Sequence, residues 1–207
     1  MLTTSSVQEF LDQVASNSPA PGGGSVSALA ASLGASLTSM VCRLTIGKKK
    51  YADVQKEMEE VLKKSEMLRA NLTSIIDEDT EAFNKVMAAF GMPKETDEQK
   101  NERGDAIQVA TKSATLVPLK LLSLCEEAVE LARTVVEKGN KNSLSDAGVS
   151  LLLLQAAANG ASLNVRINLS ALEDEKFRKE TTQQVHVVSG KIEGVIAGVM
   201  AELNARL

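Results

Sequence analysis

Apolar residues recur at steps of three and four, or sums of these steps, along most of the chain. In the clearest run, between Tyr51 and Phe90, the apolar positions are Val54, Met58, Val61, Leu68, Leu72, Ile75, Ala82 and Val86. This spacing places them on one face of a helix, so the pattern predicts one long amphipathic helix. The run stops at Gly91-Met92-Pro93.

A second long helix is expected from Thr96 onwards, because Thr96 and Gln99 have the spacing of a capping box. The apolar set that follows is Ala106, Val109, Ala110, Leu116, Val117, Leu121, Leu124, Ala128, Leu131 and Val135. Pro118 lies inside this run. Because proline lacks an amide hydrogen and clashes with the preceding turn, we expect it to kink or divide the helix.

The remaining segments are also helical by pattern. A turn over 139–143 precedes a helix to about Leu172, with Ser143 or Ser145 as its expected N-cap, and a final helix covers about 174–203. Near the start of the chain we expect a short helix over 7–15 and a longer one over 26–45. No segment has a persuasive strand pattern.

These elements predict an all-α fold, an antiparallel bundle of long helices in a single domain over residues 1–207. The helices over 26–45 and 156–171 are rich in Ala, Ser and Gly, which allows close approach, and we expect them at the centre of the bundle. The same small-residue surfaces are suited to burial against a second subunit, so a homodimer is expected.

Composition narrows the class of protein. Aromatic residues make up 2% of the chain and the net charge is −4, without basic residues interleaved with aromatics, so nucleic acid is not expected as a partner. The uncharged stretch 26–42 is too short and too rich in Ser and Thr for a membrane helix. Cys42 and Cys125 stand outside any metal-type spacing, and no signal peptide is apparent, which indicates a reducing cytoplasm and no metal.

The stretch from Pro19 to Ser25 contains two prolines and three glycines, followed by a helix. Gly22, Gly23 and Gly24 free the backbone at the expected helix start, and Ser25 is a candidate N-cap. Free N–H groups at a helix N-terminus receive anions, so the loop is a candidate binding site for a ligand carboxylate. The alternative is a hinge whose glycines allow close helix packing.

Two aspartates, Asp77 and Asp79, lie inside the predicted helix 51–90. At about 100° per residue they point in nearly opposite directions. Asp79 shares the face of Leu72 and Ile75, so its carboxylate should face the core or a cavity, where burial raises a carboxyl pKa. Asp79 is therefore the best general acid/base candidate, unless a Lys or Arg neutralises it; Asp77 is expected in solvent unless its face meets another subunit.

Other polar residues have two readings each. Asn164 and Asn168 are one turn apart, so their amides can orient a polar ligand or join two helices. Lys48, Lys49 and Lys50 are either solvated charges at a helix end or a site for a polyanionic tail. His186, the one histidine, is not preceded by a Glu-x-x-His motif, which disfavours a di-iron bundle.

Taken together, three blocks resemble the cyclodeaminase/cyclohydrolase family of folate enzymes, which includes the C-terminal domain of formiminotransferase-cyclodeaminase and bacterial methenyltetrahydrofolate cyclohydrolases. They occur in the family's order over nearly the whole chain. The blocks are 19–26, PAPGGGSV; 77–83, DEDTEAF; and 139–168, which includes Gly139-Asn140, Ser145-Asp146, Gly160-Ala161 and Asn164-Val165-Arg166-Ile167-Asn168.

The resemblance implies an all-helical dimer that acts on reduced folate, with no cofactor beyond the tetrahydrofolate substrate. The family's catalytic aspartate lies in the block that matches 77–83, and helical phase favours Asp79 over Asp77. The glycine loop with Ser25 would hold the pterin or a glutamate carboxylate, and Lys48 and Lys49 the polyglutamate tail. Asn140, Asn164 and Asn168 are candidates for pterin or carbonyl contacts.

Two activities fit the resemblance, cyclodeaminase and cyclohydrolase. Each passes through a tetrahedral carbon and moves one proton, which a single carboxylate can carry. The alternative is a non-catalytic helical bundle that binds a folate or a partner, since a fold does not fix an activity.

Overall fold

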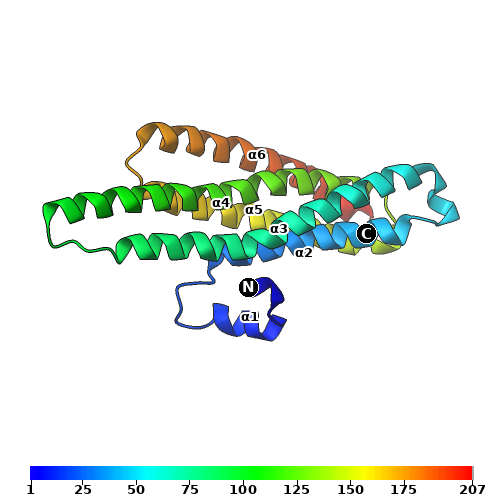
Figure 1. The fold of residues 1–207 in the computed structure, drawn as a ribbon. Coiled ribbons are helices and arrows are strands. Elements are labelled where there is room, and N and C mark those ends of the chain that lie inside the picture. The colour runs from blue at the N-terminus through cyan, green and yellow to red at the C-terminus, as the bar shows by residue number, and fades with distance from the viewer. Residues whose placement is uncertain (207) are drawn as a thin grey trace.

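Five long helices, α2 to α6, form an elongated bundle in the computed structural model, which describes residues 1–206 (Figure 1). Residue 207, the last of the expected domain, lies outside the described residues. No strand occurs within residues 1–206, as the all-α prediction requires. The long helices are α2 (Gly23–Thr45), α3 (Gln55–Phe90), α4 (Asp97–Lys138), α5 (Leu144–Ser170) and α6 (Glu175–Arg206). The short elements are the 3-10 helices η1 (Leu2–Thr4), η2 (Lys49–Val54) and η3 (Lys141–Ser143), and the α-helix α1 (Val7–Val14).

Helix boundaries follow local capping at some positions and not at others. The expected box at the start of α4 is confirmed: the Thr96 side chain accepts from the Gln99 N–H and the Gln99 side chain accepts from the Thr96 N–H. Ser143 is at the N-cap position of α5 but its side chain makes no cap hydrogen bond, and Ser145 lies within the helix. The predicted N-cap position is therefore confirmed at Ser143, without the side-chain hydrogen bond of a cap, and the alternative at Ser145 is wrong. Instead, Asn140 holds the turn, because its side chain accepts from the Asn142 N–H.

Close approach of α2 and α5 forms the middle of the bundle, as the small residues of both helices predict. Gly34 of α2 lies against Leu154 of α5, and a Cβ at Gly34 would lie 2.9 Å from Leu154 Cγ. Ser150 of α5 donates to the Gly34 carbonyl at 2.7 Å, and its hydroxyl is 2.9 Å from Thr38 Oγ1. Small side chains thus bring two helices close enough for direct hydroxyl contacts.

Two helical segments are long and apolar enough to cross a membrane by length and composition alone, Gly23–Thr45 and Lys141–Ser170. In the first, 61% of the most apolar window is buried inside the fold, and in the second, 50%. The core helix of a soluble protein passes the same test. Much of the apolar character of both segments is therefore accounted for by packing within the bundle.

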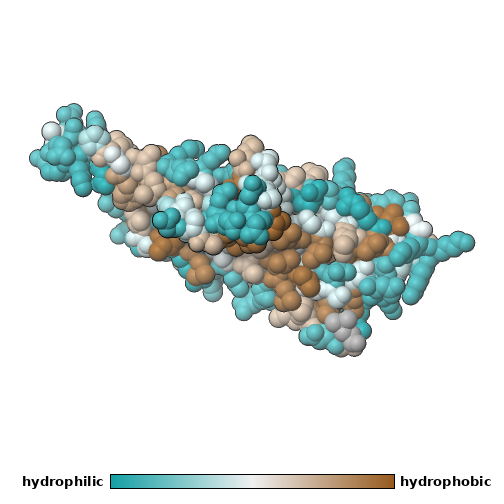
Figure 2. All heavy atoms as spheres, turned by 90° about the horizontal axis from the view of Figure 1, so that it is seen from below, coloured by the Kyte–Doolittle hydropathy of each residue, from teal (hydrophilic) through white to brown (hydrophobic). Residues whose placement is uncertain are grey.

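The outward faces of α2 and α5 keep several large apolar side chains exposed. Leu33 and Leu44 of α2 are 48% and 40% exposed, and Leu152 and Leu163 of α5 are 49% and 63% exposed. Figure 2 shows apolar residues gathered along the face seen from below, beside the N-terminal part of the chain.

Candidate active site

The carboxylate of Asp79 lies against the first turn of α2. Asp79 Oδ2 is 3.0 Å from the hydroxyl of Ser25, which donates to it. Gly24 is so close that a Cβ built there would overlap the Asp79 carboxylate unless one of the two moved. The glycine at position 24 thus makes room for the carboxylate, a requirement of packing between α2 and α3.

Burial raises the pKa of Asp79, while the hydroxyl and backbone N–H of Ser25 act in the opposite direction. Within residues 1–206 no lysine or arginine forms an ion pair with this carboxylate, so the expected alternative of a neutralising cation is not found. A partly buried carboxyl without a cation has a pKa above its ordinary range, which suits a group that exchanges a proton with the substrate.

The hydroxyl of Ser25 satisfies Asp79 in either protonation state. Ser25 Oγ is 3.0 Å from the Ile76 carbonyl oxygen, 3.0 Å from Asp79 Oδ2 and 3.2 Å from Thr80 Oγ1. With Asp79 ionised, Ser25 donates to the carboxylate. With Asp79 protonated, the carboxyl donates to Ser25, which then donates to Ile76. Neither state leaves a buried polar group unpaired, so the proton can leave and return at low cost.

The start of α2 differs from the sequence prediction. Gly22 is the N-cap, with extended backbone, and Ser25 is the third residue of the helix, where it is fully buried. Ser25 as an N-cap is therefore a wrong prediction. The first turn of α2 faces Asp79, so an internal carboxylate occupies the place that the sequence assigned to a ligand anion.

Asn164 of α5 lies at the other side of the same turn. A Cβ at Gly23 would lie 3.7 Å from Asn164 Nδ2, and that amide nitrogen donates to the Gly160 carbonyl at 2.8 Å. Asn164 also lines a shallow surface hollow with Leu163 and Arg166. Asp79, the α2 turn and Asn164 are therefore brought together from three helices.

Asn168 has a structural partner that the sequence prediction missed. Its amide donates to the Ala114 carbonyl at 3.2 Å. Ala114 is the residue four positions before Pro118, and α4 continues through Pro118 without a break, so of the two expected effects of the proline, a kink or a division, the division is wrong. Proline has no N–H to give to the carbonyl at i−4, and the Asn168 amide supplies the missing donor. This matches the alternative in which the amide joins two helices.

We expect Asn168→Ala to lower the free energy of unfolding by about 1–3 kcal/mol, because it leaves the Ala114 carbonyl unpaired. In a Pro118→Ala background the main-chain N–H at position 118 can replace the amide, so the same substitution should cost less. Urea unfolding of the four proteins in this double-mutant cycle measures the difference. Equal costs in both backgrounds would contradict the assignment.

Asp77 is neither near Asp79 nor free in solvent. Its Oδ1 accepts from the Leu2 N–H at 2.6 Å and its Oδ2 accepts from the Thr3 hydroxyl at 2.8 Å. Asp77 therefore joins the N-terminal 3-10 helix η1 to α3 through these two hydrogen bonds. The expectation of a solvated side chain is wrong, because the start of the same chain covers that face.

The connections from α2 to η2 and from α4 to η3 lie at the end of the bundle opposite to the start of α2 (Figure 1). Lys48 and Lys49 belong to the first connection and Asn140 to the second, whereas Asp79 lies against the start of α2. The length of α2, 23 residues, separates the two ends by about 33 Å. Asn140 is buried, its N–H donates to Thr45 Oγ1, and its amide donates to the Leu44 carbonyl. One chain therefore does not unite these residues with Asp79 in a single site, and these contacts join Asn140 to the last turn of α2.

Some features were not predicted. Thr80 lies in the sequence block 77–83, but nothing in the sequence predicted that its hydroxyl lies beside that of Ser25. A hollow between the end of α5 and the start of α6, lined by Arg166 and Arg178, depends on how two helices pack and left no sequence signal. In the part of the chain that the structure describes, no cluster of three or more His, Cys, Asp or Glu side chains is placed to hold a metal ion.

Comparison with known protein families identifies the family to which a chain with this arrangement belongs. The family model described as formiminotransferase-cyclodeaminase matches residues 6–187, which include Asp79, the glycine loop and Asn164. The chain belongs to the formiminotransferase-cyclodeaminase family. The resemblance carried by the three sequence blocks is thereby confirmed.

Members of the formiminotransferase-cyclodeaminase family match the chain over almost all its length. A methenyltetrahydrofolate cyclohydrolase of Methylorubrum extorquens is 46% identical over 207 residues, which are 100% of this chain and 96% of that protein. A formimidoyltransferase-cyclodeaminase of Rattus norvegicus is 33% identical over 205 residues, but the match spans 38% of that longer protein. The crystal structure of a formiminotetrahydrofolate cyclodeaminase from Thermotoga maritima superposes with a TM-score of 0.89, at 32% identity, over 99% of this chain and 98% of that one.

Proposed function

We propose that this protein is a methenyltetrahydrofolate cyclohydrolase in which Asp79 is the general base. The single observation that carries the proposal is the half-buried Asp79 carboxyl against the first turn of α2, in a chain 46% identical over its full length to a protein of that name. The raised pKa of Asp79 and its two satisfied protonation states supply the proton transfer that this hydrolysis needs.

In the reaction, water adds to the methenyl carbon that bridges N5 and N10 of the folate. Ionised Asp79 accepts a proton from the attacking water, and a tetrahedral carbinol forms. The carbon–N5 bond then breaks as the carbinol oxygen loses its proton and N5 gains one, which gives 10-formyltetrahydrofolate. The substrate is a cation and the product is neutral, so one proton is released overall. Asp79 takes a proton from water in the first step. In the second step it gives a proton to N5 and takes the carbinol proton, and its release of that proton to solvent restores the carboxylate.

A second candidate is formiminotetrahydrofolate cyclodeaminase, which the match to the Thermotoga maritima structure favours. There N10 attacks the formimino carbon, and ammonia leaves from the tetrahedral carbon after its nitrogen is protonated. Protonated Asp79 would act as the acid for that departure. The two activities therefore need opposite starting protonation states of the same carboxyl.

The test is to supply the purified protein with each folate. For 5,10-methenyltetrahydrofolate, the loss of methenyl absorbance is followed at a pH where uncatalysed hydrolysis is slow. For 5-formiminotetrahydrofolate, released ammonia is measured. Turnover of the methenyl compound with the higher kcat/KM supports the proposal. Turnover of the formimino compound alone supports the second candidate, and turnover of neither leaves a non-catalytic binding bundle.

Gly22, Gly23 and Asn164 are the residues we assign to the pterin side of the substrate, since Gly22 and Gly23 precede Gly24, which borders the Asp79 carboxylate, and Asn164 lies beside Gly23. The reaction moves a proton and makes no redox change, so no cofactor beyond the folate itself is required. We place the protein in the cytoplasm, where its two free, buried cysteines would stay reduced.

We also propose that the protein acts as a homodimer through the exposed apolar faces of α2 and α5 (Figure 2). Exposed apolar side chains on neighbouring helices favour burial against a second copy. Sedimentation equilibrium at micromolar concentration should give twice the 22.0 kDa mass of the chain. The double variant Leu33→Asp/Leu152→Asp should sediment as a monomer. A wild-type protein of single-chain mass would contradict the proposal.

A further inference from the structure

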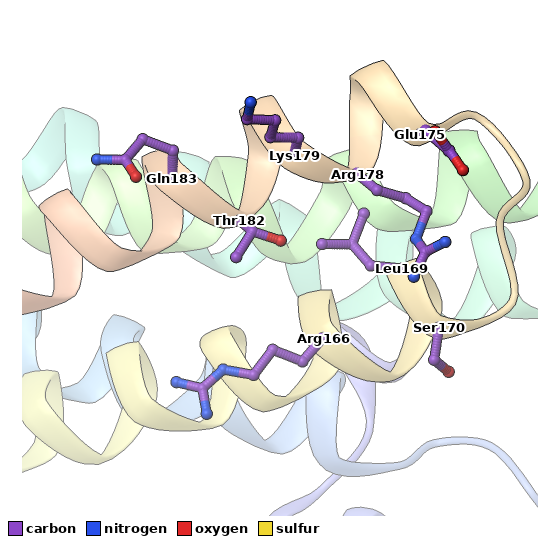
Figure 3. A pocket seen from close by; sticks show the side chains of 8 residues that line it. All are labelled: Arg166, Leu169, Ser170, Glu175, Arg178, Lys179, Thr182 and Gln183. Carbon is purple, nitrogen blue, oxygen red and sulfur yellow. The ribbon is translucent and has the colours of Figure 1, made fainter.

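A hollow of about 660 Å³ lies between the C-terminal turns of α5 and the N-terminal turns of α6. Figure 3 shows the guanidinium of Arg178, from α6, turned towards the end of α5, and that of Arg166 extended along α5 beneath α6. Lys179 stands at the rim with its ammonium directed away from α5, and Glu175 is the one acidic residue of the lining. Thr182 and Gln183 add polar groups to the α6 wall.

The positively charged side chains of this hollow form no ion pair with an acidic side chain in the described part of the chain. Within residues 1–206, Arg166, Arg178 and Lys179 form no ion pair, although Lys112 nearby pairs with Asp174 at 2.8 Å. The chain as a whole carries a net charge of −4, so an unpaired group of two arginines and a lysine runs against its overall balance. Guanidinium groups bind carboxylates through paired hydrogen bonds, which makes carboxylates the chemistry that this hollow favours.

The hollow is near the reacting end of the bundle. Arg166 is two residues from Asn164, and both line the same shallow hollow on α5. Asn164 in turn borders the α2 turn that receives Asp79. The lysines over 48–50 lie at the opposite end, about 33 Å from the α2 start. A folate carries its carboxylates at the end remote from its pterin, joined by a flat aromatic spacer, so its anionic end must lie beside the reacting site and not within it.

We infer that the hollow formed by Arg166 and Arg178 binds the glutamate carboxylates of the folate. This assignment rests on the proposed folate activity. It moves the tail site from Lys48 and Lys49 to the α5–α6 end. Additional γ-linked glutamates extend over the Lys179 rim, so a polyglutamate binds more tightly than a monoglutamate.

The experiment uses the full chain and two readouts. Isothermal titration with 5-formyltetrahydrofolate triglutamate, which has no methenyl bridge to hydrolyse, gives Kd, and turnover of 5,10-methenyltetrahydrofolate triglutamate gives KM and kcat. For Arg166→Gln/Arg178→Gln we expect Kd and KM to rise at least about 10-fold, since each lost charge-assisted bond contributes that much. The kcat should stay unchanged. Added salt should weaken wild-type binding more than binding by the variant.

The matched control is Lys48→Gln/Lys49→Gln, which removes the same charge at the far end. It should leave Kd unchanged. An unchanged Kd in the arginine variant, an equal loss in the lysine control, or no binding by the wild type would overturn the assignment. Arginine-dependent binding without turnover leaves the tail site standing and refutes the proposed activity, whereas full turnover with an unchanged Kd does the reverse.

Discussion

Replacing Asp79 with Asn should reduce kcat for methenyltetrahydrofolate hydrolysis by about 10²–10⁴-fold, the usual contribution of a general base. The amide keeps the size of the side chain and can still accept from Ser25 Oγ, but it takes up no proton. KM should change little, because the substitution removes a group that acts on the reacting water. Initial rates above the uncatalysed background, measured with saturating substrate, give the comparison.

The matched control is Asp77→Asn, two residues away on the same helix. Its oxygens accept from Leu2 and Thr3 and lie on the opposite face of α3 from Asp79. This variant should keep a kcat close to wild type, while the N-terminal turn exchanges its amide hydrogens faster. If Asp77→Asn were inactive and Asp79→Asn active, the assignment of the base would be reversed.

Gly24→Ala should cost both stability and activity. The added Cβ would overlap the Asp79 carboxylate, so either the carboxylate or the α2 turn must move. Overpacking of this kind lowers the free energy of unfolding by about 1–3 kcal/mol. Displacement of Asp79 from Ser25 should also lower kcat. Urea unfolding and initial rates on the same preparation measure the two effects.

Gly194 provides the comparison for this substitution. It lies within α6, and a Cβ there meets nothing within 4 Å. Gly194→Ala should therefore raise the free energy of unfolding, by about 1 kcal/mol, because alanine is the better helix former. Activity should be unchanged. A Gly24→Ala protein with wild-type kcat and stability would show that the close packing of α2 on Asp79 is not required.

Helical periodicity was enough to predict the bundle and the direction of Asp79. The steps of three and four from Leu72 through Ile75 fix which side of α3 faces its neighbours, and Asp79 shares that side. The short side chains of α2 and α5 likewise predicted that these two helices would pack closely. These properties depend on one helix at a time, so the sequence contains them.

Contacts between segments that are distant in the sequence could not be predicted from helical periodicity. Ser25 is a residue type that often caps helices, but α2 begins at Gly23 with Gly22 as its N-cap, and Ser25 lies inside the first turn, where its hydroxyl donates to Asp79 of α3. The partner of Asp77 lies 75 residues away, and no periodicity points to it. The use of Asn168 as a substitute donor for the turn before Pro118 requires α4 and α5 to be placed side by side.

The separation of Lys48 and Asn140 from Asp79 was open to a sequence argument. A helix over 26–45 already spans most of the bundle length, so residues that follow it lie at the opposite end from residues that precede it. The family resemblance assigned these residues to one folate site. The topology of the bundle places them at its two opposite ends.

Direct titration of the Asp79 carboxyl tests the central claim, that this group carries the proton in catalysis. Carboxyl resonances of protein labelled with ¹³C-aspartate are followed against pH, and their comparison with Asp79→Asn identifies the signal of Asp79. We expect a midpoint above the ordinary range of an aspartate, because burial raises its pKa. The same midpoint should limit kcat/KM for methenyltetrahydrofolate, with activity rising as the carboxyl ionises. An Asp79 midpoint at the ordinary value, or a kcat/KM profile that rises at a different pH, would contradict the claim.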